Sequence, residues 1–158
     1  GVDVQLKPTG SPGGRTTRKL KTDGEGRFES YELIPGDWIV TATHGAFLKL
    51  EPHRRPLEKD ADKVSVKLYL DPGLVIGGIV TTEDGARLAK ASVLVTGRSA
   101  SGSWKKRWAT TDGQGRFRLT GFERGTYTLL ARRSGYRNRR VKELYGGEES
   151  LRVLLKKR

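Results

Sequence analysis

An internal repeat is the feature that most constrains how this chain of 158 residues can fold. Residues Thr22–Phe28 read Thr-Asp-Gly-Glu-Gly-Arg-Phe, and Thr111–Phe117 repeat them 89 positions later with a single change, Glu to Gln. The same offset matches Trp38 with Tyr127, and the alignment of the two copies needs no gap between the Thr22 motif and Trp38. A repeat of this period predicts two copies of one small module rather than one larger domain.

Each copy contains short runs rich in β-branched and aromatic residues. In Trp38–Ala42 and Tyr127–Ala131 every second side chain is expected to face inward, which is the period of a β-strand. The Asp-Gly-x-Gly stretches before them predict hairpin turns. Residues 64–68 resemble residues 151–155, so both are expected to be a last strand. Turns at this spacing and the lack of a helical period predict two all-β sandwiches.

The boundary between the modules is predicted at Asp71-Pro72-Gly73, giving modules 1–72 and 73–158. The second module opens with a strand at Leu74–Val80. The first has no counterpart to that strand, because Gly1 aligns with Lys90. We therefore expect the first module to lack its opening strand. Either the chain begins inside a module, which we favour, or another chain supplies the strand.

The pattern of the second copy resembles the carboxypeptidase regulatory-like domain, of the transthyretin-like or prealbumin-like group. The residues that carry the resemblance are Gly78-x-Val80, Ala91-x-Val93-x-Val95, Thr111-Asp112-x-x-Gly115-x-Phe117 and Gly125-x-Tyr127. The first copy is similar through Thr22-Asp23-x-x-Gly26-x-Phe28. The resemblance implies a seven-stranded Greek-key sandwich in each module, and an accessory place in a secreted, periplasmic or surface protein. A fold does not by itself define a function.

Positive charge is concentrated in the second module. Residues 1–72 hold 12 Lys and Arg against 11 Asp and Glu, whereas residues 73–158 hold 19 against 7, which accounts for 12 of the net +13. Such asymmetry favours an anionic partner: an acidic polysaccharide or other polyanion, a lipid headgroup layer, nucleic acid or an acidic protein neighbour. The alternative is a strongly charged, merely soluble surface. No apolar run approaches the roughly 18 residues of a transmembrane segment.

Two clusters are candidate binding sites for a polyanion or glycan. In the first, an expected strand places Trp104, Lys106 and Trp108 on one solvent-facing side. Aromatic faces there could stack on sugar rings or bases while lysine pairs with anions. The alternative is that the tryptophans cap the core or pack on the other module. The second cluster is arginine-rich, and arginine suits phosphate, sulfate or carboxylate groups. The candidate residues are Trp104, Lys105, Lys106, Arg107, Trp108, Arg132, Arg133, Arg137, Arg139 and Arg140.

Catalytic and metal-binding patterns are poorly represented. The chain has no cysteine, and neither His44 nor His53 has a nucleophile at a motif spacing. The loops at Asp23 and Asp112 supply too few oxygens at set positions for calcium and are interpreted as turns. There is no glycine-rich phosphate loop. We therefore expect no enzyme activity, no metal and no cofactor.

Together these patterns predict a non-catalytic, extracytoplasmic module pair within a larger protein that contains further domains. Its second module is expected to bind an anionic glycan or envelope polymer. A structural spacer or protein-interaction module is the alternative. Nucleic-acid binding ranks third, because no nucleic-acid-binding motif is present.

Overall fold

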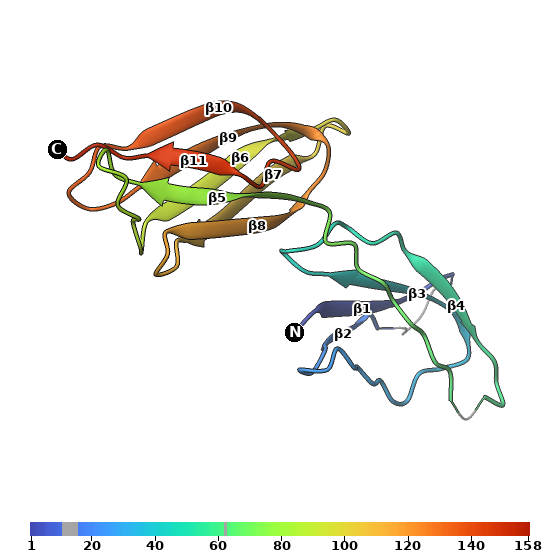
Figure 1. Ribbon diagram of the computed structural model, residues 1–158. Coiled ribbons are helices and arrows are strands. Elements are labelled where there is room, and N and C mark those ends of the chain that lie inside the picture. The colour runs from blue at the N-terminus through green and yellow to red at the C-terminus, as the bar shows by residue number, and fades with distance from the viewer. Residues whose placement is uncertain (11–15, 62) are drawn as a thin grey trace. The chain divides into compact units, whose positions relative to one another are not determined.

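The computed structural model describes residues 1–10, 16–61 and 63–158, and over these ranges the protein is built from β-strands without a helix (Figure 1). It divides into two compact units, unit 1 (Gly1–Asp71) and unit 2 (Pro72–Arg158), which are described separately below. Within the described ranges, no helix has the length and apolarity needed to cross a membrane.

Unit 2 is a sandwich of two sheets, as the sequence predicts. One sheet has four strands in the order β10-β9-β6-β7, and the other has three in the order β11-β5-β8. All pairs are antiparallel except β11 with β5. The strands are β5 (Leu74–Thr81), β6 (Ser92–Ser99), β7 (Trp104–Thr110), β8 (Arg116–Phe122), β9 (Gly125–Arg132), β10 (Arg139–Tyr145) and β11 (Leu151–Leu154).

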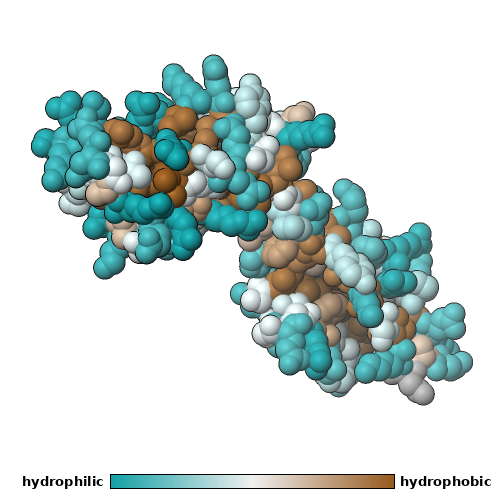
Figure 2. Space-filling model, in the orientation of Figure 1, coloured by the Kyte–Doolittle hydropathy of each residue, from teal (hydrophilic) through white to brown (hydrophobic). Residues whose placement is uncertain are grey.

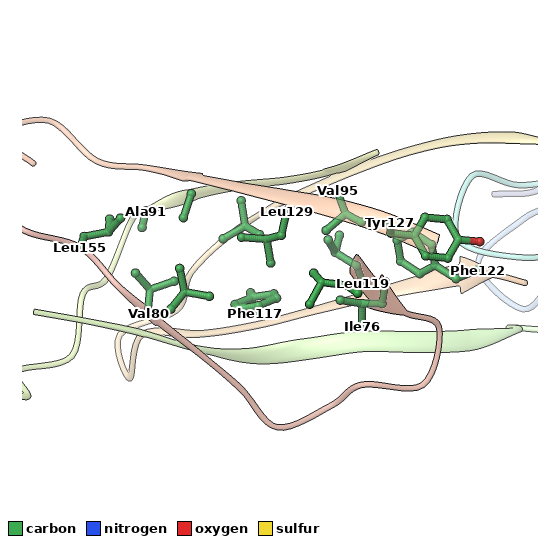
Figure 3. Close-up of a cluster of buried hydrophobic side chains, with 14 residues drawn as sticks. Ile76, Val80, Ala91, Val95, Phe117, Leu119, Phe122, Tyr127, Leu129 and Leu155 are labelled. Atoms are coloured by element: carbon green, nitrogen blue, oxygen red, sulfur yellow. The ribbon is translucent and has the colours of Figure 1, made fainter. Parts of the chain in front are cut away.

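The core of unit 2 lies between these two sheets (Figure 3). Along β9 the side chains of Tyr127, Leu129 and Ala131 are almost completely buried, and they alternate with more exposed neighbours at the predicted period of two. Phe122 closes one end of the core with its ring edge against Tyr127, at a centroid distance of 4.9 Å. The opposite side of the four-stranded sheet faces away from this core.

Unit 1 contains one four-stranded sheet. Its strands are β1 (Asp3–Pro8), β2 (Arg18–Lys21), β3 (Gly36–Thr43) and β4 (His53–Leu57), in the order β2-β1-β3-β4. At the 89-residue offset these strands fall on β6, β7, β9 and β10, and the sheet of unit 1 thus repeats the order β7-β6-β9-β10. Its buried side chains are Val4, Leu6, Trp38, Val40 and Ala42.

Two details of the sequence prediction are wrong. The Asp-Gly-x-Gly turn at Asp112 does not close a hairpin, because β7 and β8 belong to different sheets and the turn carries the chain across the sandwich. Residues 64–68, expected to be a strand, carry no strand assignment. Their counterpart β11 is held by parallel pairing with β5, and no strand in the described part of unit 1 corresponds to β5. Over its described residues, unit 1 thus forms only one of the two expected sheets.

Candidate binding face on the four-stranded sheet of unit 2

Strand β7 lies at an edge of the four-stranded sheet and exposes its aromatic side chains. Burial alternates along the strand, and Trp104 and Trp108 are 61% and 72% exposed. Lys106, between them, is also exposed. Neither tryptophan belongs to the core cluster of unit 2. The three side chains therefore share one outward side, as the sequence pattern predicts.

The register of the four strands extends this side into a continuous surface, which we call the outer face. Residues directly opposite one another on paired strands point to the same side of a sheet, so each set of partners forms a row. From β10 towards β7, the rows are Arg132–Ser92–Thr110, Arg140–Leu130–Leu94–Trp108, Thr128–Thr96–Lys106 and Tyr145–Thr126–Arg98–Trp104.

The outer face combines three exposed aromatic rings with four cations. Trp108 and Trp104 are four residues apart on one strand, or about 13 Å, and the four strands span about 14 Å across the rows. None of the residues of the four rows is acidic. Lys142 and Glu143 lie at a β-bulge of β10 and outside the rows. A surface of this kind can stack on flat rings and pair with anionic groups at the same time.

Two predicted site residues of β7 point away from the outer face. Lys105 forms an ion pair with Glu123 at 2.8 Å, and its side chain is only 12% exposed. The Lys105 ammonium and the Ser101 hydroxyl, both bonded to Glu123, hold the pKa of that carboxyl below its usual value. Arg107 donates from Nη1 to the Lys106 carbonyl at 3.0 Å, while its buried Nε has no hydrogen-bond partner. Both cations belong to the interior side of the strand.

The arginine cluster is divided between different places. Arg132 and Arg140 lie on the outer face, whereas Arg139 pairs with Ala131, in a row of the inward side. Arg133 donates from Nη1 to the Lys90 carbonyl at 3.0 Å and so ties the end of β9 to a neighbouring loop. Arg137 lies in the connection from β9 to β10, where its amide N–H donates to the Lys156 carbonyl at 2.8 Å. Only two of the five arginines in this cluster therefore join the tryptophans.

Sequence reasoning missed several residues of the outer face. Arg98 is the direct partner of Trp104, and Leu94 is the partner of Trp108. Leu130 and Tyr145 extend the same rows. The alternation along β6 could have placed Leu94 and Arg98 on the side of that strand that faces away from the core, because its valines face inward. The residues that lie beside them on neighbouring strands could not be deduced from this alternation, because pairing depends on the order of the strands in the sheet.

The aspartate loops are structural turns in both units. The Asp112 carboxylate accepts the backbone N–H groups of Gln114 and Arg116 at 2.9 and 2.8 Å, and pairs with Arg116 Nε at 3.1 Å. Asp23 accepts the N–H groups of Glu25 and Arg27 in the same way. The N–H donors, with that of Arg116 as the strongest cause, lower the pKa of Asp112. Over the described ranges no three His, Cys, Asp or Glu residues gather as a metal site would require.

Comparison with known proteins identifies the type of module. The sequence profile of the carboxypeptidase regulatory-like domain matches residues 75–155, which make up most of unit 2 and just over half of the chain. No curated protein matches the chain.

Several solved structures resemble the fold at low identity. A 3-chlorocatechol 1,2-dioxygenase from Rhodococcus opacus has a TM-score of 0.45 and 14% identity, and covers 54% of this chain and 59% of its own. A streptococcal ancillary pilin has a TM-score of 0.48 and 19% identity, and the match covers 100% of this chain and 57% of the pilin. A shaft pilin from Lactobacillus rhamnosus GG has a TM-score of 0.46 and 14% identity, and the match covers 100% of this chain and 88% of the pilin. The chain thus spans little more than half of the dioxygenase and of the ancillary pilin.

Proposed function

The chain belongs to the carboxypeptidase regulatory-like domain family, and from that premise we propose that it is a non-catalytic accessory module pair of a secreted or cell-surface protein. Its second unit binds an anionic glycan or envelope polymer through the outer face. The ligand lies along the sheet, with rings stacked on tryptophan and anionic groups paired with the neighbouring cations.

The exposure of Trp104 and Trp108 is the observation that carries this proposal. Both indoles keep well over half of their surface in water, although each could contribute 1.5 kcal/mol or more, roughly, if it were buried. Large apolar side chains that gather on an exposed face and are surrounded by polar residues are typical of a binding site. Here Leu94, Leu130 and Tyr145 continue the same apolar and aromatic surface across the sheet.

Charge supports an anionic ligand. Unit 2 carries a large positive net charge, and the rows of the outer face add Arg98, Lys106, Arg132 and Arg140 without a carboxylate. A face with one sign of charge attracts ligands of the opposite sign and raises their association rate. Charge alone is weakly selective, however, so the aromatic rings must supply the preference for a polymer that offers flat rings.

The non-catalytic part of the proposal rests on how the reactive groups are used. The Asp112 and Asp23 carboxylates hold their own turns, and Glu123 pairs with Lys105. His44 accepts the Ala46 N–H on Nδ1 at 3.2 Å. These polar groups serve local structure, and neither Asp112 nor Glu123 belongs to the rows of the outer face.

A glycan array probed at two salt concentrations tests the proposed function. The intact chain is compared with Trp104→Ala and Trp108→Ala, and Leu154→Ala serves as the control. Leu154 is also exposed, at 40%, but it lies on β11 in the other sheet. We expect binding to acidic polysaccharides that persists at moderate salt. Each tryptophan variant should lose at least about tenfold in affinity, which corresponds to about 1.4 kcal/mol, while the control binds normally.

Three other results would contradict the proposal. Binding of any polyanion at low salt only, unchanged in the tryptophan variants, would reduce the interaction to bulk charge. A preference for single-stranded nucleic acid over glycans, lost in the same variants, would assign the outer face to bases. Absence of binding to all probes would leave a structural spacer or protein-interaction module as the better interpretation.

A further inference from the structure

The charge of unit 2 is distributed unevenly between the two ends of its sandwich. Four segments that begin or end strands meet at the end where the C-terminal residues lie (Figure 1), and we call them the basic end: residues 82–91, 111–115, 133–139 and 155–158. They hold eight Lys and Arg against three Asp and Glu. The connections at the opposite end hold one against three: residues 100–103, 123–124 and 146–150.

Hydrogen bonds hold the four segments of the basic end together. The Lys90 N–H donates to the Thr111 carbonyl at 3.0 Å, and the Lys90 carbonyl accepts a bond from Arg133 Nη1 at 3.0 Å. The Arg137 N–H donates to the Lys156 carbonyl at 2.8 Å. Because folding itself makes these bonds, the cations of the basic end are brought together before any ligand binds.

The acidic residues of the basic end are already engaged by neighbouring groups. Glu83 pairs with Lys156 Nζ at 2.9 Å, and Asp112 pairs with Arg116 Nε at 3.1 Å. Asp84 accepts a hydrogen bond from a threonine hydroxyl of its own turn. These carboxylates therefore leave most of the positive charge of the basic end uncompensated.

Three cations of the basic end have charged groups that are free for an external partner. Lys90, Arg137 and Arg139 are exposed, and over residues 63–158, all of which the structure describes, their side chains form no hydrogen bond or ion pair. Cations held close together on one surface attract anions from solution. Guanidinium groups in particular pair with phosphate oxygens through two parallel hydrogen bonds.

The cations of the basic end are spread in two directions. Residues 155–158 follow β11 of the three-stranded sheet, 133–139 join two strands of the four-stranded sheet, and 82–91 connect the two sheets. Packed sheets lie about 10 Å apart and four strands span about 14 Å, so the cations cover a patch rather than a line. On the displayed face, Figure 2 shows hydrophilic residues at this end. None of the exposed large hydrophobic residues of unit 2, whose residues are all described, lies in the four segments.

We propose that the basic end docks unit 2 against an anionic lipid bilayer. A bilayer presents phosphate groups across a plane and meets all of these cations at once, whereas a single polymer chain follows one line. Without an exposed apolar side chain to insert, the contact is electrostatic and weakens as salt is added. This surface differs from the outer face, which lies along the side of the sandwich.

Cosedimentation of the intact chain with lipid vesicles tests this docking. One set of vesicles contains equal parts of phosphatidylglycerol and phosphatidylcholine, and the other contains phosphatidylcholine alone. We expect binding only to the first set. A variant carrying Lys90→Gln, Arg137→Gln and Arg139→Gln should lose at least about tenfold in affinity for it. The replaced side chains hold no hydrogen bond, so this variant should keep the urea midpoint of the parent.

A matched variant removes the same number of positive charges elsewhere in unit 2, through Arg124→Gln, Lys142→Gln and Arg152→Gln. These residues are exposed and lie outside both the basic end and the rows of the outer face. The matched variant should lose less than about threefold, because charges away from the contact are screened. Equal losses in the two variants would overturn the proposal, since bulk charge would then explain the binding. Absence of binding to the anionic vesicles would overturn it as well.

Amide hydrogen exchange of the vesicle-bound chain locates the contact. Residues 82–91 and 133–139 should exchange more slowly on anionic vesicles, whereas β7 should not change. Trp104→Ala and Trp108→Ala should bind the vesicles as the parent does, which separates this proposal from glycan binding by the outer face. Vesicle binding that is lost in the tryptophan variants would overturn the proposal. Tighter binding to nucleic acid or to an acidic polysaccharide, lost in the triple variant of the basic end, would assign this end to a polymer instead.

Discussion

Trp38 and Tyr127 occupy the same position in the two copies and make the same hydrogen bond with different groups. The indole Nε1 of Trp38 donates to the Ile34 carbonyl at 3.0 Å, and the Tyr127 hydroxyl donates to the Glu123 carbonyl at 2.9 Å. In each case the acceptor lies four residues upstream, in the turn before the strand. A large aromatic side chain with one polar atom thus serves both the core and the turn.

Tyr127→Phe isolates the polar half of this role. The ring keeps its edge-to-face contact with Phe122, but the Glu123 carbonyl loses its donor. We expect the free energy of unfolding of unit 2, measured with urea, to fall by about 1 to 3 kcal/mol, the range for a polar group that loses its partner away from water. Leu129→Ala, which removes a fully buried side chain, should cost about 2 to 5 kcal/mol. A Tyr127→Phe variant as stable as the parent would show that water satisfies the carbonyl.

The Asp112 carboxylate makes the turn before β8 sensitive to acid. Its pKa is lowered in the folded state, first by the Arg116 N–H, so the stabilising effect is fully present above the unfolded pKa of about 3.9. It is lost as the pH falls through the lower folded pKa. We expect the melting temperature of unit 2 to decrease when the pH is lowered beyond about 4. The decrease should be less steep in the Asp112→Asn variant. Parallel pH profiles for the two proteins would contradict this origin.

At the level of strands, the close approach of β5 to β11 depends on Gly78. A Cβ there would lie 2.2 Å from the Leu151 carbonyl oxygen and 2.8 Å from its Cβ, so the two strands would have to separate. Gly78→Ala is expected to destabilise unit 2 by about 1 to 3 kcal/mol, as over-packing does. Gly113→Ala is the matched control, because a Cβ at Gly113 meets nothing within 4 Å. Equal urea midpoints for the two variants would show that the strands can separate freely.

Strands were predictable where local sequence suffices, and not where they need a distant partner. The alternation in Trp38–Ala42 and Tyr127–Ala131 predicted β3 and β9 together with their buried sides. The outward side of Trp104, Lys106 and Trp108 followed from the same period. Strand order decided the rest. It gives Trp104 its partner Arg98, carries the Asp112 turn across the sandwich, and leaves residues 64–68 without a ladder.

At the scale of the whole molecule, the two units differ in the size of their cores and in their net charge. Unit 2 has a complete sandwich, a core of 14 buried hydrophobic residues and nearly all of the net charge. Unit 1 is almost neutral, and over its described residues it has five such residues beneath a single sheet. Since burial of apolar surface is the main favourable term in folding, the difference should separate the stabilities of the two units.

We therefore expect unit 1 to unfold at a lower temperature than unit 2, and the three tryptophans allow this to be measured. Trp38 is 5% exposed in unit 1, whereas Trp104 and Trp108 are already exposed in folded unit 2. The thermal change in tryptophan emission should thus follow unit 1, and far-ultraviolet circular dichroism should show an additional later transition. Residues 72–158 alone should reproduce only the later one. Coincident transitions by both probes would instead mean that the two units unfold as one.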